Sequence, residues 1–211
     1  MSRYVGPSCR LCRREGTKLF LKGSRCLTEK CAVERRAYPA GQHGQNAGRG
    51  RKTSEYAKQL REKQKVKRMY GLTETQFRTT YTKASHLPGM KGTNLLVALE
   101  TRLDNVVYRM GFAASRRAAR QLVRHGHIEV NGKCVDIPSF KVVPGHEVRV
   151  APADREMVAV MAAQEQASRG ATVGWLSVDS EKAAGRLLEL PTRDAIPVNA
   201  QEQLIVELYS K

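Results

Sequence analysis

Residues 115–150 carry the pattern that most narrows the folds open to this chain of 211 residues. Ser115 is followed by apolar residues at helical spacing as far as Gly126, and beyond that glycine apolar and polar residues alternate. Serine is a favoured helix N-cap, and Asn131-Gly132 is the strongest short signal for a two-residue hairpin turn. A Pro-Gly pair then predicts a turn before another strand at 147–150. A helix that leads directly into hairpin strands indicates an α+β fold with a small, mainly antiparallel sheet.

Three further helices are predicted ahead of this region, over residues 54–70, 73–85 and 93–110. Thr73 and Gln76 have the spacing of a capping box, in which each side chain bonds the other residue's backbone N–H. The third helix carries a broad apolar stripe at helical spacing, so we expect it to be core and assign it no binding role.

In the last third of the chain the sequence predicts both helices and strands: a helix over 151–168, strands over 174–178 and 186–190, and a helix over 201–209. Asn199 and Glu202 have the spacing of a second capping box ahead of the final helix. Alternation of apolar residues over 204–208 leaves a strand open there.

Positive charge is concentrated toward the N-terminus. Residues 1–70 hold 19 Lys and Arg against 5 Asp and Glu, residues 71–150 hold 12 against 6, and residues 151–211 hold 6 against 9. The net charge of +17 would destabilise the folded chain by self-repulsion unless a polyanion neutralises it, and nucleic acid is the polyanion we expect. The acidic last third is expected to pack internally or to face a protein.

Neither a membrane nor a secreted setting is expected. No apolar run approaches the roughly 20 residues of a membrane helix, and the basic segments lack the apolar face that binds a lipid surface. The N-terminus has no apolar signal region. The sequence therefore predicts a cytoplasmic protein in a reducing compartment, with no membrane partner and no small-molecule substrate.

Four of the five cysteines have metal-ligand spacing: Cys9, Cys12, Cys26 and Cys31. Two pairs of thiolates from separate turns would complete the tetrahedron that zinc prefers, with no position left for water or substrate. The sequence predicts one structural Zn²⁺ in residues 1–45. An iron–sulfur cluster uses the same ligands and stays open, as do His43 in place of one thiol and disulfides, which a reducing compartment disfavours. Cys134 is interpreted as a structural thiol of the hairpin.

The helix over 115–126 carries four arginines that share neighbouring parts of its surface: Arg116, Arg117, Arg120 and Arg124. Arginine binds phosphate oxygens in pairs and stacks on exposed bases. No acidic residue stands four positions away to pair with them, which favours nucleic-acid binding over a solvated basic face. The sequence predicts that this helix contacts RNA.

A resemblance to the S-four (S4) RNA-binding module covers the run LETRLDNVVYRMGFAASRRAARQLVRHGHIEVNGKCVDIPSFKVVPGHEVRV. In that module two helices precede a small sheet, and the second helix and the hairpin face structured RNA. The module also occurs in pseudouridine synthases, tyrosyl-tRNA synthetases and heat-shock RNA-binding proteins, so it implies RNA binding without specifying one protein.

The rest of the chain resembles the family of bacterial small-subunit ribosomal protein four, in its four-cysteine, zinc-bearing form. The matching segments are RYVGPSCRLCRREG, YPAGQHGQ, EYAKQLREKQKVKRMYG, Trp175-Leu176-Ser177 and NAQEQLIVELYSK. Ala40 departs from the pattern, since many members have proline there. The resemblance implies three units: a zinc knuckle over residues 1–45, a helical domain over 46–94 that is completed by 191–211, and an inserted S4-type RNA-binding domain over 95–190.

The resemblance also implies a function in translation. The family binds small-subunit ribosomal RNA early, at a multi-helix junction, and nucleates assembly of the subunit body. It contacts ribosomal protein five at an interface that influences decoding accuracy, and it lines the messenger RNA entrance. Glu202 and Glu207, in the acidic last segment, are our candidates for the contact with ribosomal protein five.

The candidate RNA contacts are the basic and polar residues of the basic segments and of the S4-like run. They are Arg3, Arg10, Arg13, Arg14, Arg35, Arg36, Gln42, His43, Arg49, Arg51, Lys52, Lys58, Arg61, Lys65, Arg68, Ser115, Arg116, Arg117, Arg120, Arg124, His125 and Lys133.

Two other classes of protein fit the sequence less well. An RNA-modifying or aminoacylating enzyme needs a catalytic domain, and residues 151–211 are too few for one and show no nucleotide-binding loop or catalytic triad. A zinc-finger DNA regulator needs a recognition helix between its ligand pairs, whereas the stretch GTKLFLKG between Cys12 and Cys26 reads as hairpin-like. The sequence therefore predicts a structural, non-enzymatic constituent of the small ribosomal subunit that binds ribosomal RNA.

Overall fold

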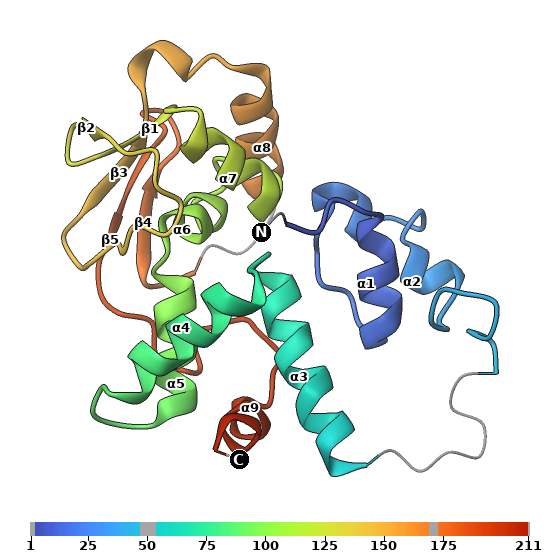
Figure 1. Cartoon of the computed structure of the whole chain (residues 1–211). Helices are drawn as coiled ribbons and strands as arrows, with labels where there is room; N and C mark the ends of the chain where they lie inside the picture. The colour runs from blue at the N-terminus through green and yellow to red at the C-terminus, as the bar shows by residue number, and fades with distance from the viewer. Residues whose placement is uncertain (1–2, 47–53, 169–172, 211) are drawn as a thin grey trace.

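The computed structural model describes residues 3–46, 54–168 and 173–210. Its elements, with η for 3₁₀ helices, are α1 Ser8–Glu15, η1 Gly23–Leu27, α2 Ala32–Arg35, α3 Glu55–Met69, α4 Glu74–Ser85, α5 Lys91–Glu100, α6 Leu103–Arg109, α7 Arg116–Arg124, β1 Ile128–Val130, β2 Lys133–Cys134, β3 Glu147–Val150, η2 Pro152–Asp154, α8 Val158–Ser168, β4 Leu176–Asp179, β5 Ala184–Leu187 and α9 Glu202–Tyr209. Figure 1 shows an N-terminal part with α1 and α2, a helical part with α3, α4, α5 and α9, and a sheet part that runs from α6 to β5. The predicted α+β class is confirmed.

The sheet part contains antiparallel strands in the order β2-β1-β3-β5-β4. The predicted hairpin is present, with Val130 opposite Lys133. Asn131 and Gly132 have φ angles of 50° and 79°, the left-handed values that a two-residue hairpin turn requires. Helices α6 and α7 pack with the strands around a buried core whose largest side chain is Trp175.

The helical part has a separate core where α3, α4, α5 and α9 meet. The predicted capping box begins α4, because the hydroxyl of Thr73 accepts the backbone N–H of Gln76 and Oε1 of Gln76 accepts the backbone N–H of Thr73. At the far end of the chain α9 returns to pack beside α3 (Figure 1). Ile205 of α9 is fully buried. Residues 202–209 are therefore helical, which decides against a strand there.

The prediction of one continuous helix over 93–110 is wrong, because α5 ends before Thr101 and α6 begins after Arg102. Arg102 forms an isolated β-bridge with Lys141, and the carbonyl of Thr101 accepts the N–H of Val142 at 2.9 Å. The backbone at this break is paired with a loop of the sheet part. An apolar stripe depends only on residues close together in the sequence, so it cannot reveal that the backbone pairs with a distant segment.

The change from one core to the other falls at the same break. Leu99 is the last α5 side chain in the helical core, and Leu103 is the first α6 side chain in the sheet core. The predicted ranges 46–94 and 95–190 meet within α5, whereas α5 packs with α4 and α9 in the helical part. We therefore propose that the helical and RNA-binding domains meet at residues 101–102.

Smaller differences occur later in the chain. Helix α8 begins at Val158 after the 3₁₀ helix η2, not at residue 151. Strand β4 begins two residues later than predicted, and β5 begins two residues earlier. The predicted capping box of α9 is absent, since Gln201 occupies the N-cap without a side-chain hydrogen bond. The carboxylate of Glu202 instead accepts Nε of Arg193 at 2.7 Å, a partner outside the local pattern.

Helix α1 is attached to α3 by a buried carboxylate. The side chain of Glu15 is 2% exposed and is paired with Arg61 at 3.3 Å and with Arg68. Burial raises the pKa of Glu15, although both arginines oppose that rise. The N-terminal part is thus joined to the helical part by charges that neither part pairs internally.

The helical and sheet parts are joined at Glu100, the last residue of α5, which is fully buried. Its carboxylate accepts the hydroxyl of Tyr70 at 2.6 Å, Nδ2 of Asn105 at 2.6 Å, and Nε and Nη2 of Arg109 at 2.9 and 2.7 Å. Tyr70 follows α3, whereas Asn105 and Arg109 belong to α6. Burial raises the pKa of Tyr70 well above its ordinary value, and so does the charge of Glu100, so the hydroxyl keeps its donor proton.

Replacement of the Glu100 carboxylate should destabilise the chain more than the small change in the side chain suggests. Glu100→Gln leaves the guanidinium of Arg109 without its ion-pair partner, and breaking a buried pair costs about 3 to 5 kcal/mol. Burial would raise the pKa of Glu100, but hydrogen bonds and charge from Arg109, with the charge of Arg116, lower it overall. The stabilisation is therefore present above the ordinary value of 4.5 and is lost as the pH falls through the lowered pKa.

Urea unfolding at pH 7, repeated between pH 5 and pH 3, measures both effects. The wild-type chain should lose stability faster than Glu100→Gln over the acidic range. The control is Glu55→Gln, which removes an exposed pair with Lys58 and should change the free energy of unfolding by less than about 1 kcal/mol. Equal stability of the two variants at pH 7 would contradict the role given to Glu100.

Candidate nucleic-acid interface

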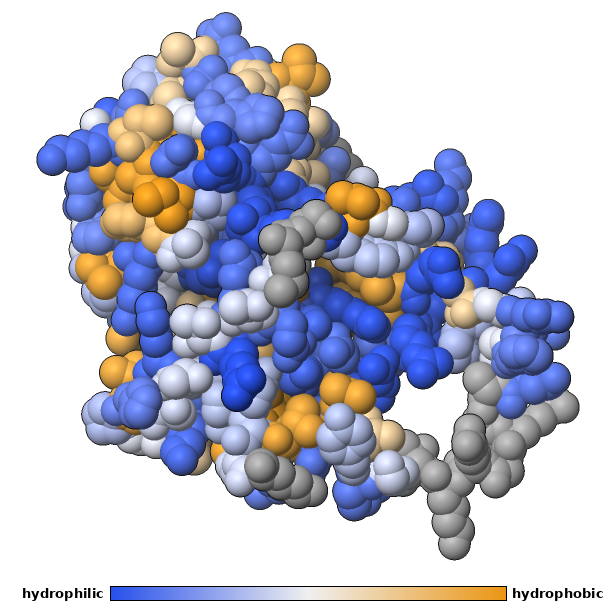
Figure 2. Space-filling view, in the orientation of Figure 1, coloured by the Kyte–Doolittle hydropathy of each residue, from blue (hydrophilic) through white to orange (hydrophobic). Residues whose placement is uncertain are grey.

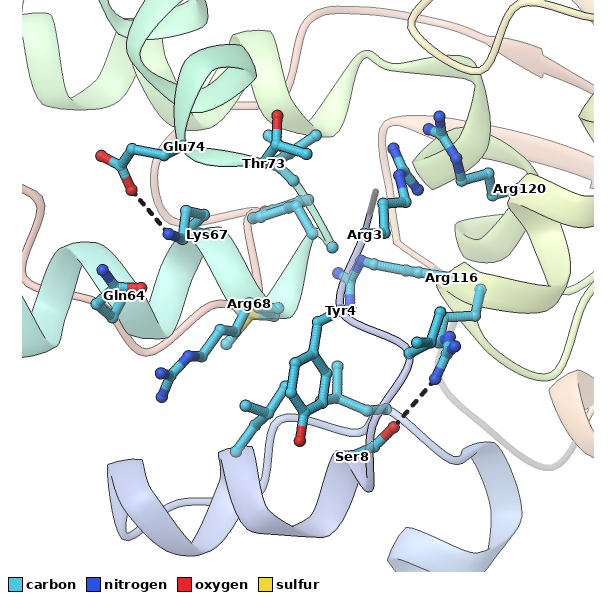
Figure 3. Close-up of a pocket in the computed structure, with 18 of the residues that line it drawn as sticks. Arg3, Tyr4, Ser8, Gln64, Lys67, Arg68, Thr73, Glu74, Arg116 and Arg120 are labelled. Atoms are coloured by element: carbon cyan, nitrogen blue, oxygen red, sulfur yellow. Dashed lines mark hydrogen bonds and ion pairs between the residues drawn. The ribbon is translucent and has the colours of Figure 1, made fainter. Parts of the chain in front are cut away.

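The three parts meet at a hollow of about 640 Å³, here called the central groove. It is lined by the chain ahead of α1, by the turn from α3 into α4, and by α7 (Figure 3). Seven basic residues line it: Arg3, Lys67, Arg68, Arg116, Arg117, Arg120 and Arg124. Among its described lining residues the one acid is Glu74, which is already paired with Lys63 and Lys67 at 2.7 Å each. Figure 2 shows hydrophilic side chains gathered in the region between the N-terminal part and the rest of the molecule.

Helix α7 begins as predicted, because the Ser115 hydroxyl accepts the N–H of Ala118 at 3.3 Å. The predicted arginines do not all face solvent. The guanidinium of Arg116 lies 4.8 Å from the ring of Tyr70 and 4.6 Å from that of Tyr108, and its side chain is only 11% exposed. Its Nε also donates to Asn105 at 2.8 Å. Arg116 therefore ties α7 to the surroundings of Glu100 and has little surface left for a ligand.

Arg120 shares one carboxylate with a second arginine. Asp104 accepts Nη1 of Arg120 at 3.1 Å and is held by Arg102 through contacts of 3.0 and 3.1 Å. Burial, with the like charge of Arg120, lowers the pKa of Arg3 to about 10, a value at which Arg3 is still protonated at pH 7. Three guanidinium groups thus gather around a single carboxylate, and the surplus positive charge favours an anion in the groove.

The N-terminal part lies directly against the start of α7. The hydroxyl of Ser8 accepts Nη1 of Arg117 at 3.2 Å. Gly23 has a φ of +58°, and a Cβ there would come within 2.6 Å of the carbonyl oxygen of Ala114. Glycine is needed at this position for both reasons, which indicates that the N-terminal part supports the helix that presents the arginines.

Several predicted contacts have partners within the chain. Arg13 donates to the carbonyls of Tyr38 and Pro39 at 2.8 and 3.2 Å. Lys65 is paired with Glu62 at 2.7 Å, and the pairs of Arg61, Arg68 and Lys58 are described above. The following predicted contacts are at least partly exposed: Arg10, Arg14, Arg35, Arg36, Gln42, His43, Lys58, Arg117, Arg124, His125 and Lys133. Arg49, Arg51 and Lys52 lie outside the described residues.

Sequence reasoning did not select some residues that line the groove, among them Tyr4, Gln64, Lys67 and Gln121. Gln64 lies three positions from Arg61 and four from Arg68 along α3, so helical spacing could have grouped it with them. Lys67 is the residue next to Arg68. Tyr4 has no such signal, because nothing in the sequence places it against α3 and α7.

The four predicted metal ligands line one small cavity of about 20 Å³. Cys12, Cys26 and Cys31 are buried, Cys9 is partly buried, and no disulfide joins them. Burial raises the pKa of Cys12, with smaller contributions from the other three thiols. Among the described residues no three side chains of His, Cys, Asp or Glu form a recognisable metal-binding group.

Two details of this segment differ from the prediction. Cys9 and Cys12 lie on α1, three residues apart, and not on a tight turn. Between Cys12 and Cys26 the described chain contains η1 and no strand, so the hairpin-like interpretation is wrong.

Glu202 and Glu207, the candidate protein contacts, line a second hollow of about 840 Å³ between the start of α5 and α9. Glu202 is paired with Arg193, and Glu207 accepts Nε2 of Gln59 at 3.0 Å. Both carboxylates thus also hold α9 in place. In the part of the chain that the structure describes, no helix has the length and apolar character to cross a membrane.

Comparison with known proteins gives two family matches that adjoin at the same break. Residues 3–100 match the family described as the ribosomal protein S4/S9 N-terminal domain, and residues 101–148 match the S4 domain, so the two matches meet at the break between α5 and α6. The small ribosomal subunit protein uS4 of Thermus thermophilus is 55% identical over 212 residues, which cover 100% of both chains. The uS4 proteins of Geotalea daltonii and Thermodesulfovibrio yellowstonii are 56% and 54% identical, again over 100% of each chain. This chain therefore belongs to the uS4 family of small ribosomal subunit proteins.

Proposed function

We propose that this chain is a structural constituent of the small ribosomal subunit that binds ribosomal RNA through the central groove and the exposed basic residues around it. Family membership makes the chain an RNA-binding ribosomal protein and not an enzyme. The observation that carries the role of the groove is the convergence of basic residues from three separate segments. Among the described lining residues there are seven of them, against a single acid that is already paired.

The groove suits a folded RNA better than an isolated strand. Its basic residues come from the N-terminal part, the helical part and the sheet part, so their phosphate partners must also come together in space. A junction of RNA helices brings several backbones close to one another. Binding there would hold the helices of the junction in place, which supports an early role in assembly of the subunit body.

The face that carries α9 is our proposed contact with ribosomal protein five. Glu202 and Glu207 line the hollow on this face, and the acidic last third has no surplus of positive charge to attract RNA. We extend to this chain the family's influence on decoding accuracy and its place at the messenger RNA entrance. Support for both roles is the resemblance to the family.

We propose that Cys9, Cys12, Cys26 and Cys31 hold one structural Zn²⁺. A donor set of four thiols is the soft, closed set that zinc accepts in structural sites, and an iron–sulfur cluster is the alternative. The four residues line one cavity of about 20 Å³, the scale of a single small occupant. The N–H of Lys22 lies 3.4 Å from Sγ of Cys26, a hydrogen bond of the kind that supports a ligand thiolate.

Removal of one exposed groove arginine tests the RNA interface. Arg124→Ala should weaken binding to small-subunit ribosomal RNA about tenfold, because a hydrogen bond to a charged group contributes about 1.5 kcal/mol or more. It should also make the slope of log affinity against log salt concentration shallower by about one unit. Filter binding over a series of salt concentrations measures both quantities.

The matched control is Lys182→Ala, which removes a largely exposed cation from the turn before β5, outside the groove. It should leave affinity and slope at their wild-type values. An Arg124→Ala variant with the wild-type slope would show that α7 does not meet phosphate.

Metal removal tests the cysteine site. A structural metal supplies folding free energy to the segment that binds it, so chelation should abolish amide protection in α1 and η1 while β1 and β3 keep theirs. Hydrogen exchange by mass spectrometry measures both regions, and native mass spectrometry should find one zinc per chain. Cys134→Ser should leave the zinc content unchanged and Cys12→Ser should lower it. Unchanged protection of α1 after complete metal removal would contradict a structural metal.

A further inference from the structure

The central groove is lined by two kinds of residue, the basic ones, here called its rim, and the apolar and aromatic ones, here called its floor. Apolar and aromatic residues line it together with the arginines: Tyr4, Val5, Leu11, Leu21, Met69 and Leu72. Phosphate contacts alone would need only the basic rim. A hollow of about 640 Å³ with an apolar floor and a few charged groups has instead the size and lining typical of a site for a small organic group.

Tyr4 occupies a fixed position in this floor. Its hydroxyl donates to the carbonyl of Pro7 at 3.3 Å, and its ring lies against Gly6, where a Cβ would come within 2.8 Å of the ring. The residue remains 49% exposed. Figure 3 shows the ring between Arg68 on α3 and Ser8 on α1, with Arg116 nearby. Unpaired bases commonly stack on an aromatic ring that is fixed in position, partly exposed and surrounded by arginines.

The positive charge that would bind a phosphate lies at one end of the same groove. Arg3 and Arg120 lie next to each other there (Figure 3), and Asp104 is shared between Arg120 and Arg102. Nη2 of Arg3 is buried and has no hydrogen-bond partner among the described residues. An unsatisfied donor of this kind costs free energy until an acceptor reaches it, and a phosphate oxygen is a strong acceptor.

We propose that the central groove holds one nucleotide of the bound RNA that is unstacked from its helix, with its base on Tyr4 and the apolar floor and its phosphate beside Arg3 and Arg120. The inference rests on the proposed function, which itself requires only that phosphates meet the basic rim. A protein segment is the less favoured occupant, because an acidic peptide would match the rim but would not require a stacking surface.

The test compares Tyr4→Ala and Tyr4→Phe in the full chain, with a transcript of small-subunit ribosomal RNA as the probe. Loss of one stacked base should weaken binding about 5- to 150-fold in Tyr4→Ala, whereas Tyr4→Phe keeps the ring and should bind like the wild type. The salt slope should stay the same in Tyr4→Ala, because no phosphate contact is removed. Ultraviolet crosslinking followed by mass spectrometry should find Tyr4 joined to a single RNA position.

Tyr56→Ala is the matched control, since Tyr56 is 58% exposed on α3 and does not line the groove. It should bind RNA with wild-type affinity, and all variants should melt at the wild-type temperature. Binding of Tyr4→Ala within twofold of wild type, an equal loss in Tyr56→Ala, or a Tyr4 crosslink to protein in assembled subunits would each overturn the inference. In those cases tight, salt-dependent binding by the wild type would leave the proposed function intact, whereas a wild-type chain that does not bind the RNA overturns both.

Discussion

A single buried carboxylate, Glu100, sets the relation between the two largest parts of this molecule. An ionised carboxylate is stable in an interior only when donors surround it, and here the donors come from both sides of the junction, Tyr70 from the helical part and Asn105 and Arg109 from the sheet part. Any rotation of one part against the other would leave the charge without some of these donors. Hydrophobic contacts alone would tolerate such a rotation far better, because they have no preferred direction.

The geometry of the central groove follows from this constraint. The hydroxyl of Tyr70 donates a hydrogen bond to Glu100, and its ring contacts the guanidinium of Arg116. One side chain therefore fixes the end of α3 relative to the start of α7. The exposed arginines of α7 thereby face Arg68 and Lys67 across the groove. Glu15 and Ser8 then place the N-terminal part along the third side. Buried charges hold the scaffold together, and the unpaired positive charges lie on the surface where they can meet RNA.

Local signals in the sequence predicted the elements well and their connections less well. Ser115, the Thr73–Gln76 pair and Asn131-Gly132 determine caps and a turn within a few residues, and all three form as expected. The break at residues 101–102 depends on pairing with Lys141, some forty residues away, and no local pattern reports it.

In the candidate site, too, local features could be predicted from the sequence and distant contacts could not. Helical spacing correctly placed four arginines on α7, but the sequence could not show that Tyr70 and Tyr108 enclose Arg116 or that Asp104 pairs with Arg120. The cysteine spacing correctly grouped four thiols that line one cavity, and the binding of a metal there is our proposal.

We infer that Glu100 organises an RNA-binding surface that it does not itself touch. The most direct measurement is the salt-dependent affinity of Glu100→Gln for small-subunit ribosomal RNA, at a temperature where circular dichroism shows the variant to be folded. Glu100→Gln should bind more weakly than wild type and with a shallower salt slope, although every groove arginine is still present, because fewer of them meet phosphate at once. A folded Glu100→Gln chain with the affinity and slope of the wild type would contradict this role of Glu100.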